Sequence, residues 1–137
     1  MTSKVTYLGD LRTECIHLRS GQTIITDAPV DNNGKGEAFS PTDLTATSLG
    51  TCMVTVMGIA ALSHDFNIDG TVLEITKIMA ADPRRISGVE VRLIMPDKIY
   101  SLKEQKILET AARTCPVALS LHPDLRQELM FVWKQKV

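Results

Sequence analysis

Residues 40–61 read SPTDLTATSLGTCMVTVMGIAA, and this stretch decides the fold of the chain. Ser40 can cap a helix, Pro41 suits the first helical position because its missing N–H would be unpaired there, and Asp43 completes a capping box. Apolar residues then recur at helical spacing, so we predict a long helix with one buried face and with Cys52 on or beside that face. The recurring residues are Leu49, Met53, Val56, Met57 and Ala60.

The residues before this helix predict a small three-stranded meander. Segments rich in apolar and β-branched residues are separated by turn residues at Gly9-Asp10 and Ser20-Gly21. The predicted strands are Val5–Leu8, Leu11–Leu18 and Gln22–Thr26. Residues 27–39, DAPVDNNGKGEAF, form a polar connection that is long for a structureless loop in a compact domain. We expect such a loop to cover a site or an interface.

The residues after the long helix predict a hairpin and then a second helix. The predicted hairpin strands are Thr71–Ala80 and Gly88–Met95. The second of these strands alternates apolar and charged residues, as expected for a sheet with one buried face. Ser101 and Glu104 form another capping box, so a helix begins after Ser101. That helix must end near Thr114, because Pro116 disfavours helical geometry at Cys115.

The C-terminal residues predict a short third helix and a final strand. Pro116 can open a helix that runs to about Leu121. Apolar residues then alternate at Leu129, Phe131 and Trp133, which is typical of a strand. The order strands, helix, strands, helices, strand indicates an α+β fold with sheets packed on one or two central helices.

The composition describes a soluble globular chain. Its 137 residues fit a single domain, residues 1–137, and 44% of them are hydrophobic and 23% charged. A net charge of −1 leaves no basic field for nucleic acid. The N-terminal residues lack the apolar core of a secretory signal, and we expect the apolar stretches to fall short of the ~18 to 20 residues that span a bilayer. The sequence therefore predicts a cytoplasmic protein without nucleic-acid or membrane partners.

The chain has three cysteines, an odd number that argues against a structural disulfide framework. Cys52 and Cys115 are the two placed for an intramolecular redox couple, although each could also be a small buried hydrophobic residue. A reactive cysteine must be a thiolate, and Cys52 lies ~16 Å along the helix from its positive end, so a thiolate there requires a side-chain cation. Cys115 lies at the N-cap of the third predicted helix, where local electrostatics favours a low pKa.

Three features carry a resemblance to a known family: the sequence SPTDL from Ser40, Cys52 eleven residues after Pro41, and the dipeptide Cys115-Pro116. Over nearly its whole length the chain resembles the OsmC/Ohr family of osmotically inducible and organic-hydroperoxide-resistance proteins. Its GKGEAFSPTDL and LGTCM runs are closest to the OsmC-like branch. The resemblance implies antiparallel sheets packed on two central helices in an intertwined homodimer, with two active sites at the subunit interface.

The resemblance also implies roles for particular residues. Members of the family are thiol peroxidases, so Cys52 would be the peroxidatic cysteine and Cys115 the resolving cysteine, with an organic hydroperoxide as the substrate. Arg12 is the candidate cation that stabilises the thiolate and the peroxide oxygen, and Arg19 is the alternative. A dithiol, which in the family can be a lipoyl group, would regenerate the two thiols.

One position departs from the family pattern. Many members carry a glutamate directly after the proline of the helix start, where it orients the arginine, and this chain has Thr42 there. Asp43 could take over that role only if its side chain turns inward, and its simpler role is the helix cap. Glu14 shares a strand face with Arg12 and offers another partner, although a surface pair of this kind contributes little.

Two functions therefore stay open from the sequence. The first is a thiol-dependent peroxidase of the oxidative stress response, in which an apolar lining from Met53 and Met57 favours a lipid-like substrate. The second is a non-enzymatic relative that binds a small apolar ligand in the same pocket or senses redox state through a reversible disulfide. No C-x-x-C or H-x-x-x-H spacing joins the histidines to the cysteines, so the sequence indicates neither a metal site nor a cofactor.

Overall fold

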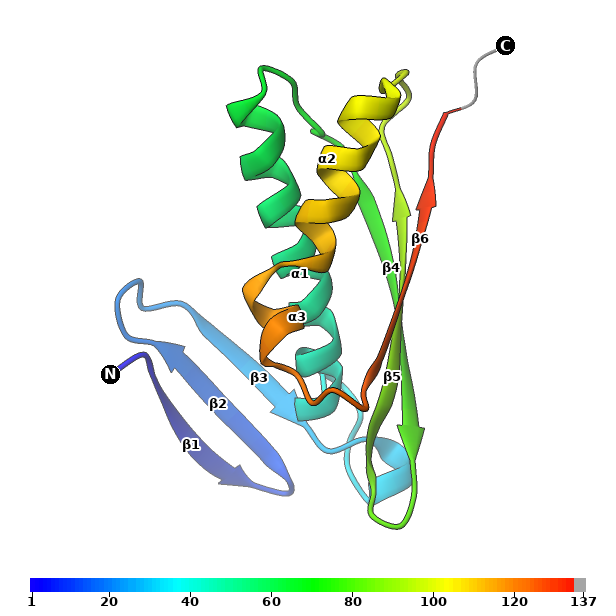
Figure 1. Cartoon of the computed structure of the whole chain (residues 1–137). Helices are drawn as coiled ribbons and strands as arrows, with labels where there is room; N and C mark the ends of the chain where they lie inside the picture. Colours follow the sequence, from blue (N-terminus) through cyan, green and yellow to red (C-terminus); the bar gives the residue numbers. More distant parts are fainter. Residues whose placement is uncertain (135–137) are drawn as a thin grey trace. The chain divides into compact units, whose positions relative to one another are not determined.

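The computed structural model describes residues 1–134, and Figure 1 shows the order of their helices and strands. The chain forms two compact units, residues 1–45 and residues 46 onward, and the boundary falls within helix α1. The predicted α+β class is confirmed, with one three-stranded sheet in each unit. The prediction that residues 1–137 form a single domain stays a prediction.

The first unit begins with the predicted meander, β1 (Ser3–Gly9), β2 (Arg12–His17) and β3 (Thr23–Asp27). The three strands pair antiparallel in the order β1-β2-β3. Asp27 was expected in the following loop, but it is the last residue of β3 and pairs with Arg12, the first residue of β2. This one-residue extension brings a carboxylate opposite an arginine.

The connection from β3 to α1 is compactly folded and contains a 3₁₀ turn, η1 (Val30–Asn32). The amide of Gly34 donates a hydrogen bond to the Pro29 carbonyl (2.9 Å), and the amide of Gly36 donates to the Ala28 carbonyl (3.2 Å). A Cβ atom at Gly34 would lie only 1.7 Å from the Ala28 carbonyl oxygen, so the close backbone approach requires glycine there. The loop is therefore long but structured.

Helix α1 (Pro41–Ser63) starts where the sequence predicts. The amide of Asp43 donates to the Ser40 hydroxyl and the amide of Ser40 donates to the Asp43 carboxylate, both at 3.0 Å, which is a complete capping box. The prediction that no apolar stretch reaches membrane-spanning length is wrong, because α1 is long and apolar enough by length and composition. The core helix of a soluble protein meets the same criterion, so this is weak evidence for a membrane span.

The second unit holds a mixed sheet of β4 (Val72–Ala80), β5 (Arg85–Ile94) and β6 (Arg126–Val132). The predicted hairpin of β4 and β5 is confirmed, although β5 starts before Gly88 and the ladder shifts register between Ile78 and Met79. The expectation of purely antiparallel sheets is wrong, because β6 pairs parallel to β5. Parallel neighbours need a crossover connection, and the helices between the two strands provide it.

That crossover consists of α2 (Leu102–Arg113) and α3 (Pro116–Ser120). The capping box of Ser101 and Glu104 is formed, with both side chains accepting a backbone N–H of the other residue. Thr114 ends α2 and Cys115 is the N-cap of α3, as the sequence predicts.

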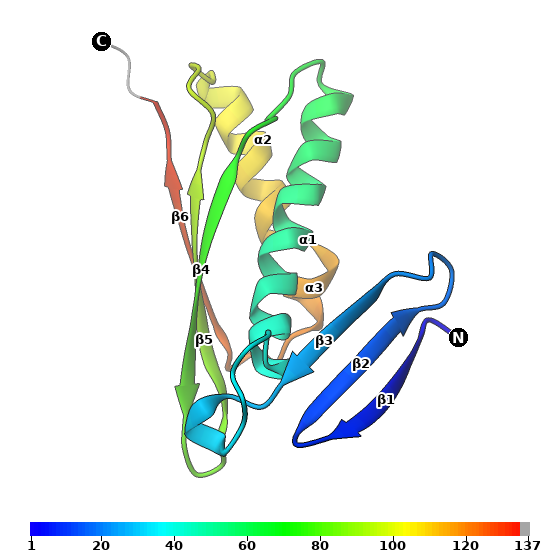
Figure 2. The same ribbon diagram turned by 180° about the vertical axis from the view of Figure 1, so that it is seen from behind.

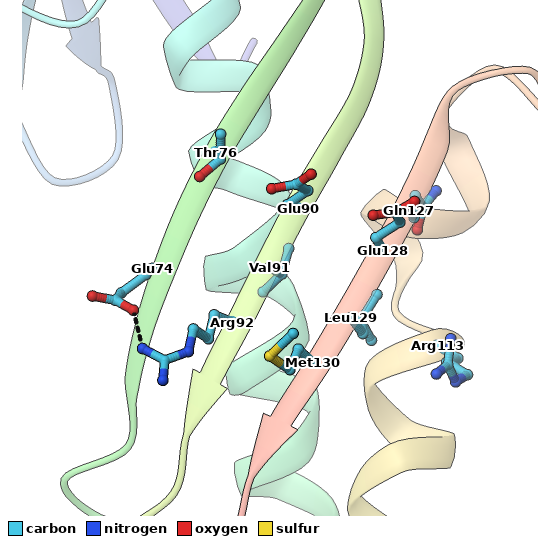
Figure 3. Close-up of a pocket in the computed structure, with 10 residues that line it drawn as sticks. All are labelled: Glu74, Thr76, Glu90, Val91, Arg92, Arg113, Gln127, Glu128, Leu129 and Met130. Atoms are coloured by element: carbon cyan, nitrogen blue, oxygen red, sulfur yellow. Dashed lines mark hydrogen bonds and ion pairs between the residues drawn. The ribbon is translucent and has the colours of Figure 1, made fainter.

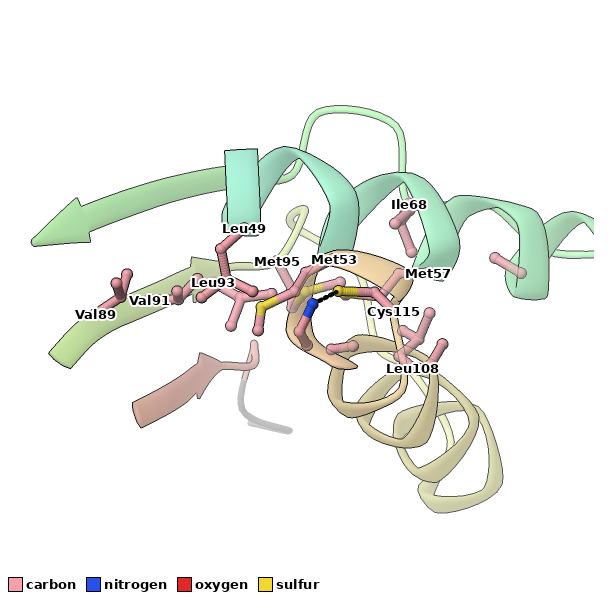
Figure 4. Packing of buried hydrophobic residues seen from close by; sticks show 14 of the residues in the cluster. Leu49, Met53, Met57, Ile68, Val89, Val91, Leu93, Met95, Leu108 and Cys115 are labelled. Carbon is pink, nitrogen blue, oxygen red and sulfur yellow. Dashed lines mark hydrogen bonds between the residues drawn. The ribbon is translucent and has the colours of Figure 1, made fainter. Parts of the chain in front are cut away.

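Helices α1, α2 and α3 cover one face of the β4-β5-β6 sheet, as the two views in Figures 1 and 2 show. Alternate residues of β5 point into this layer and meet the buried face of α1 (Figure 4). The largest fully buried apolar side chains are Leu49, Met53, Met57, Val89, Val91, Leu93 and Leu108. Cys115 is fully buried in the same cluster, so the fold fixes its position by core packing.

Candidate functional site

The two cysteines that the sequence singles out interact within the second unit. Cys52 lies on α1 and is half-buried, and Cys115 lies at the start of α3 and is fully buried. The two side chains lie close enough to interact electrostatically, and both are free thiols. The sulfurs are remote in the sequence, and the packing of α1 against the α2–α3 segment brings them together.

The prediction of a low pKa at Cys115 is wrong. Burial raises the pKa of this thiol above its ordinary value, and the neighbouring Cys52 thiol raises it further. The amide of Ala118 donates a hydrogen bond to the Cys115 sulfur (3.4 Å; dashed in Figure 4). This bond lowers the pKa of Cys115, but by less than burial raises it. Loss of water around a buried sulfur outweighs the cap of a one-turn helix, so Cys115 is kept as a thiol.

Arg12 is held in the first unit by a carboxylate that sequence reasoning missed. Its Nε and Nη2 donate to the two oxygens of Asp27, both at 2.7 Å, and Asp27 is fully buried. The hydrogen bond to Arg12 lowers the pKa of Asp27, and the same pair raises the pKa of Arg12. Arg12 therefore pairs with Asp27 across the ladder rather than with Glu14 along its own strand.

A second carboxylate also contacts Arg12. The Glu37 side chain lies 3.4 Å from Nη2 and is 69% exposed, whereas the amide of Glu37 donates to Asp27 (3.2 Å). Glu37 belongs to the polar loop that was expected to cover a site. No spacing rule links this residue to Arg12, because the folding of the loop sets the contact.

The other residues that the sequence suggested for the site, Asp43, Thr42 and Arg19, lie at the start of α1 or in an exposed turn. Asp43 caps α1 as described, and the Thr42 hydroxyl lies 3.2 Å from the Ser40 hydroxyl. Arg19 is exposed in the turn between β2 and β3. Among residues 1–134 no group of three histidine, cysteine or acidic side chains could hold a metal ion. The catalytic roles of Arg12 and Asp43 stay predictions.

An apolar groove of about 530 Å³ lies between α1 and α2. Its lining residues are Val56, Ala60, Lys103, Lys106, Ile107, Thr110, Ala111 and Thr114. Val56 is one helical turn beyond Cys52, and Thr114 directly precedes Cys115, so one end of the groove lies next to the thiols. The expected lining by Met53 and Met57 is wrong, because both side chains are fully buried in the core.

A larger hollow of about 810 Å³ lies at the β4-β5-β6 sheet (Figure 3). Five of its ten lining residues are charged, and two of them, Glu74 and Arg92, form an ion pair at 2.8 Å. No cysteine contributes to its lining. The hollow is therefore separate from the candidate redox site.

A family model described as OsmC-like protein matches residues 34–129 of the chain. A crystal structure from Psychrobacter arcticus 273-4, provisionally described as an osmotic stress induced and detoxification response protein, is 57% identical with a TM-score of 0.93. That match covers 96% of this chain and 96% of the other. The chain belongs to the OsmC-like family, and the resemblance found in the sequence is confirmed. No curated protein matches the chain.

Two organic hydroperoxide resistance proteins share the fold at low identity. OsmC of Legionella pneumophila is 14% identical with a TM-score of 0.75, and the match covers 96% of both chains. OhrB of Bacillus subtilis is 18% identical with a TM-score of 0.69, and the match covers 96% of this chain and 98% of the other. At this identity the likeness shows the fold alone.

Proposed function

We propose that this protein is a thiol peroxidase that reduces organic hydroperoxides through Cys52 and Cys115. The observation that carries the proposal is the interaction of these two free thiols inside an OsmC-like fold. Two neighbouring thiols can together supply the two electrons that cleave one O–O bond. The half-buried Cys52 and the fully buried Cys115 are suited to different steps.

The first step is attack by the Cys52 thiolate on the distal peroxide oxygen. The S–O bond forms as the O–O bond breaks, the departing alkoxide takes up a proton and becomes the alcohol, and Cys52 becomes a sulfenic acid. Cys115 is a poor candidate for this attack, because burial keeps it protonated and a thiol is a weak nucleophile. The proposed roles, Cys52 as the attacking and Cys115 as the resolving cysteine, thus follow from the different burial of the two thiols.

The second step closes a disulfide. The Cys115 sulfur attacks the Cys52 sulfenic sulfur, the S–S bond forms, and the hydroxyl group leaves as water with the Cys115 proton. A dithiol of the lipoyl type then reduces this disulfide by two thiol–disulfide exchanges and is itself oxidised to a disulfide. Both thiols are thereby regenerated for the next cycle.

The charge that develops on oxygen calls for a cation, and Arg12 is our candidate. Asp27 fixes its guanidinium group, so the cation is oriented although position 42 holds threonine. The link between Arg12 and Cys52 rests on the family resemblance. Asp43 is retained as a secondary candidate whose capping role does not require chemistry.

The apolar groove beside the thiols supports a substrate with an apolar body. A lipid-like hydroperoxide would bury that body between α1 and α2. The same groove is the observation that favours the second candidate function, a non-enzymatic protein that binds a small apolar ligand or senses redox state. The cytoplasmic homodimer expected from the sequence is part of the proposal.

Thiol counting tests the proposal. One equivalent of cumene hydroperoxide should remove two of the three thiols of each chain within seconds, and dihydrolipoamide should restore them faster than glutathione does. Cys15→Ser is the matched control, because the proposal gives Cys15, on β2, no role in the reaction; this variant should still lose two thiols. Cys52→Ser should lose none at this rate. Retention of all thiols in the wild-type protein would leave the ligand-binding function.

A further inference from the structure

Arg12 has two carboxylate partners that differ in the number and length of their hydrogen bonds to the guanidinium group and in their burial. Asp27 accepts from Nε and Nη2 in a two-pronged contact at 2.7 Å and is fully buried. Glu37 contacts Nη2 alone, at 3.4 Å, and its side chain is 69% exposed. A guanidinium group with a buried, forked partner is rigidly oriented, whereas a single long contact to an exposed carboxylate is weak.

The buried partner is itself fixed by its surroundings. Asp27 ends β3 directly opposite Arg12 in the ladder, and the Glu37 amide donates to one of its oxygens at 3.2 Å. The neighbouring Thr13 and Thr26, also a direct cross-strand pair, bond through their hydroxyl groups and tie the same strands together. Asp27 therefore holds Arg12 in place even when Glu37 moves, because the backbone of residue 37 can keep its contact while its side chain turns away.

We infer that Asp27 is the positioning residue of Arg12, replacing the glutamate that the family carries at position 42, and that the Glu37 carboxylate is an exchangeable partner displaced by the anionic oxygen of the substrate. This inference rests on the proposed function. Nη2 carries two hydrogens, and Asp27 and Glu37 each accept from that nitrogen. An oxygen that gains negative charge as the O–O bond breaks competes with Glu37 for its hydrogen and leaves the Asp27 contact intact.

The two carboxylates are therefore expected to act in opposite directions. Loss of the Asp27 charge frees the guanidinium group to adopt other orientations, so the rate of peroxide cleavage falls. Loss of the Glu37 charge removes a competitor for Nη2, so the rate rises. A purely structural account of the two residues predicts a loss or no change in both cases, and opposite signs distinguish the two accounts.

The experiment measures the second-order rate constant of thiol loss with cumene hydroperoxide in the Cys15→Ser background. We expect Asp27→Asn to lower it by about 10- to 100-fold, since misoriented electrostatic groups lose much of their effect on a transition state. Glu37→Gln should raise it by up to about fivefold, the range of an exposed ion pair. Arg12→Ala should lose at least as much as Asp27→Asn.

A double variant separates positioning from folding. Asp27→Asn combined with Arg12→Ala should be no slower than Arg12→Ala alone, because residues that act through one another are not additive. A further drop in the double variant would show that Asp27 acts on something other than Arg12. If Asp27→Asn does not fold, Arg12→Lys serves instead: lysine keeps the charge but cannot form the fork, so the same loss is expected.

Each result bears on the inference in a defined way. No thiol loss in the wild-type protein refutes the proposed function and the inference with it. A reactive wild type with an unchanged rate in Asp27→Asn or Arg12→Lys overturns the positioning role alone. A lower rate in Glu37→Gln overturns the exchange role. Loss in Asp27→Asn, gain in Glu37→Gln and no further loss in the double variant support the inference.

Discussion

Asp27 lies directly opposite Arg12 in the β2–β3 ladder. Its fully buried carboxylate accepts hydrogen bonds from Nε and Nη2 of the Arg12 guanidinium group, both at 2.7 Å. In our inference this pair takes the place of an arginine–glutamate pair, since Thr42 stands where the resemblance leads us to expect the glutamate. The charge that orients the arginine comes from a strand instead of from the start of α1. Arg12 and its partner thus belong to one sheet.

The pair predicts a specific loss of stability in acid. Arg12 lowers the pKa of Asp27 below its ordinary value near ~3.9, so the folded state binds the proton less readily than the unfolded state. The stabilisation that the ionised Asp27 contributes to the folded protein is complete above that ordinary pKa. It is lost as the pH falls through the lower pKa of Asp27 in the folded protein. Urea unfolding between pH 7 and pH 2 should show a steeper loss for the wild type than for Asp27→Asn.

The matched control for that experiment is Glu37→Gln. It removes a carboxylate that also contacts Arg12, but at 3.4 Å and largely in solvent. Its acid profile should follow the wild type closely. Equal profiles for the wild type and Asp27→Asn would contradict the assigned cause.

Local signals were sufficient to predict most of the fold. Capping boxes at Ser40 and Ser101 placed the starts of α1 and α2 correctly, because a cap depends on neighbours in the sequence. The parallel pairing of β6 with β5 was missed, because strand direction depends on the path of the crossover. Sequence periodicity identifies a strand but not the neighbour beside which it lies.

Only part of the candidate site could be predicted, because the rest also depends on how segments far apart in the sequence pack together. Cys52 and Cys115 could be selected by their positions on predicted helices. Asp27 was assigned to a loop, because the register that places it opposite Arg12 depends on the true length of the β2–β3 turn, which is longer than the Ser20-Gly21 dipeptide indicates. The pKa of Cys115 was predicted in the wrong direction because its N-cap position is local, whereas its burial depends on packing from α1 and the sheet.

Gly34 is expected to be intolerant of substitution. A Cβ atom there would lie 1.7 Å from the Ala28 carbonyl oxygen, and backbone atoms cannot turn aside as a side-chain end can. Gly34→Ala should therefore open the loop that carries Glu37 and increase proteolysis between residues 28 and 39. Gly58→Ala is the control, because no atom beyond its chain neighbours and the adjoining backbone of α1 lies within 4 Å of its added Cβ, so α1 should remain intact. Equal proteolysis of both variants would refute the packing argument.

Met57 is predicted to contribute to stability and not to substrate contact. Its side chain is fully buried among the core residues and does not line the groove between α1 and α2. Met57→Ala should lower the free energy of unfolding by about 2–5 kcal/mol, the usual cost of such a cavity. Met130→Ala, at a position 61% exposed on β6, should change it by about 0.5 kcal/mol or less.

A substrate role for Met57 would be visible in kinetics. At a temperature where Met57→Ala is folded, its rate of thiol loss with cumene hydroperoxide should match that of Met130→Ala. A selective loss of rate for apolar hydroperoxides, with the rate for hydrogen peroxide unchanged, would return Met57 to the binding site.

The buried thiol of Cys115 predicts a loss of stability in alkali. Its pKa is raised in the folded state, mainly by burial, so the folded protein keeps the proton over a pH range in which the unfolded chain releases it. The stabilisation that the protonated Cys115 contributes to the folded protein is complete below the ordinary cysteine pKa of ~8.5. It is lost as the pH rises through the higher pKa of Cys115 in the folded protein. Urea midpoints of the reduced protein should therefore fall above about pH 8.5, and less so in Cys115→Ala.

The same burial predicts the order in which the thiols react with iodoacetamide. At pH 8 the half-buried Cys52 should be alkylated well before Cys115, because Cys115 is both covered and protonated. Peptide mapping over time would assign each modified residue. Alkylation of Cys115 first, in folded protein, would reverse the proposed roles and make Cys115 the attacking cysteine.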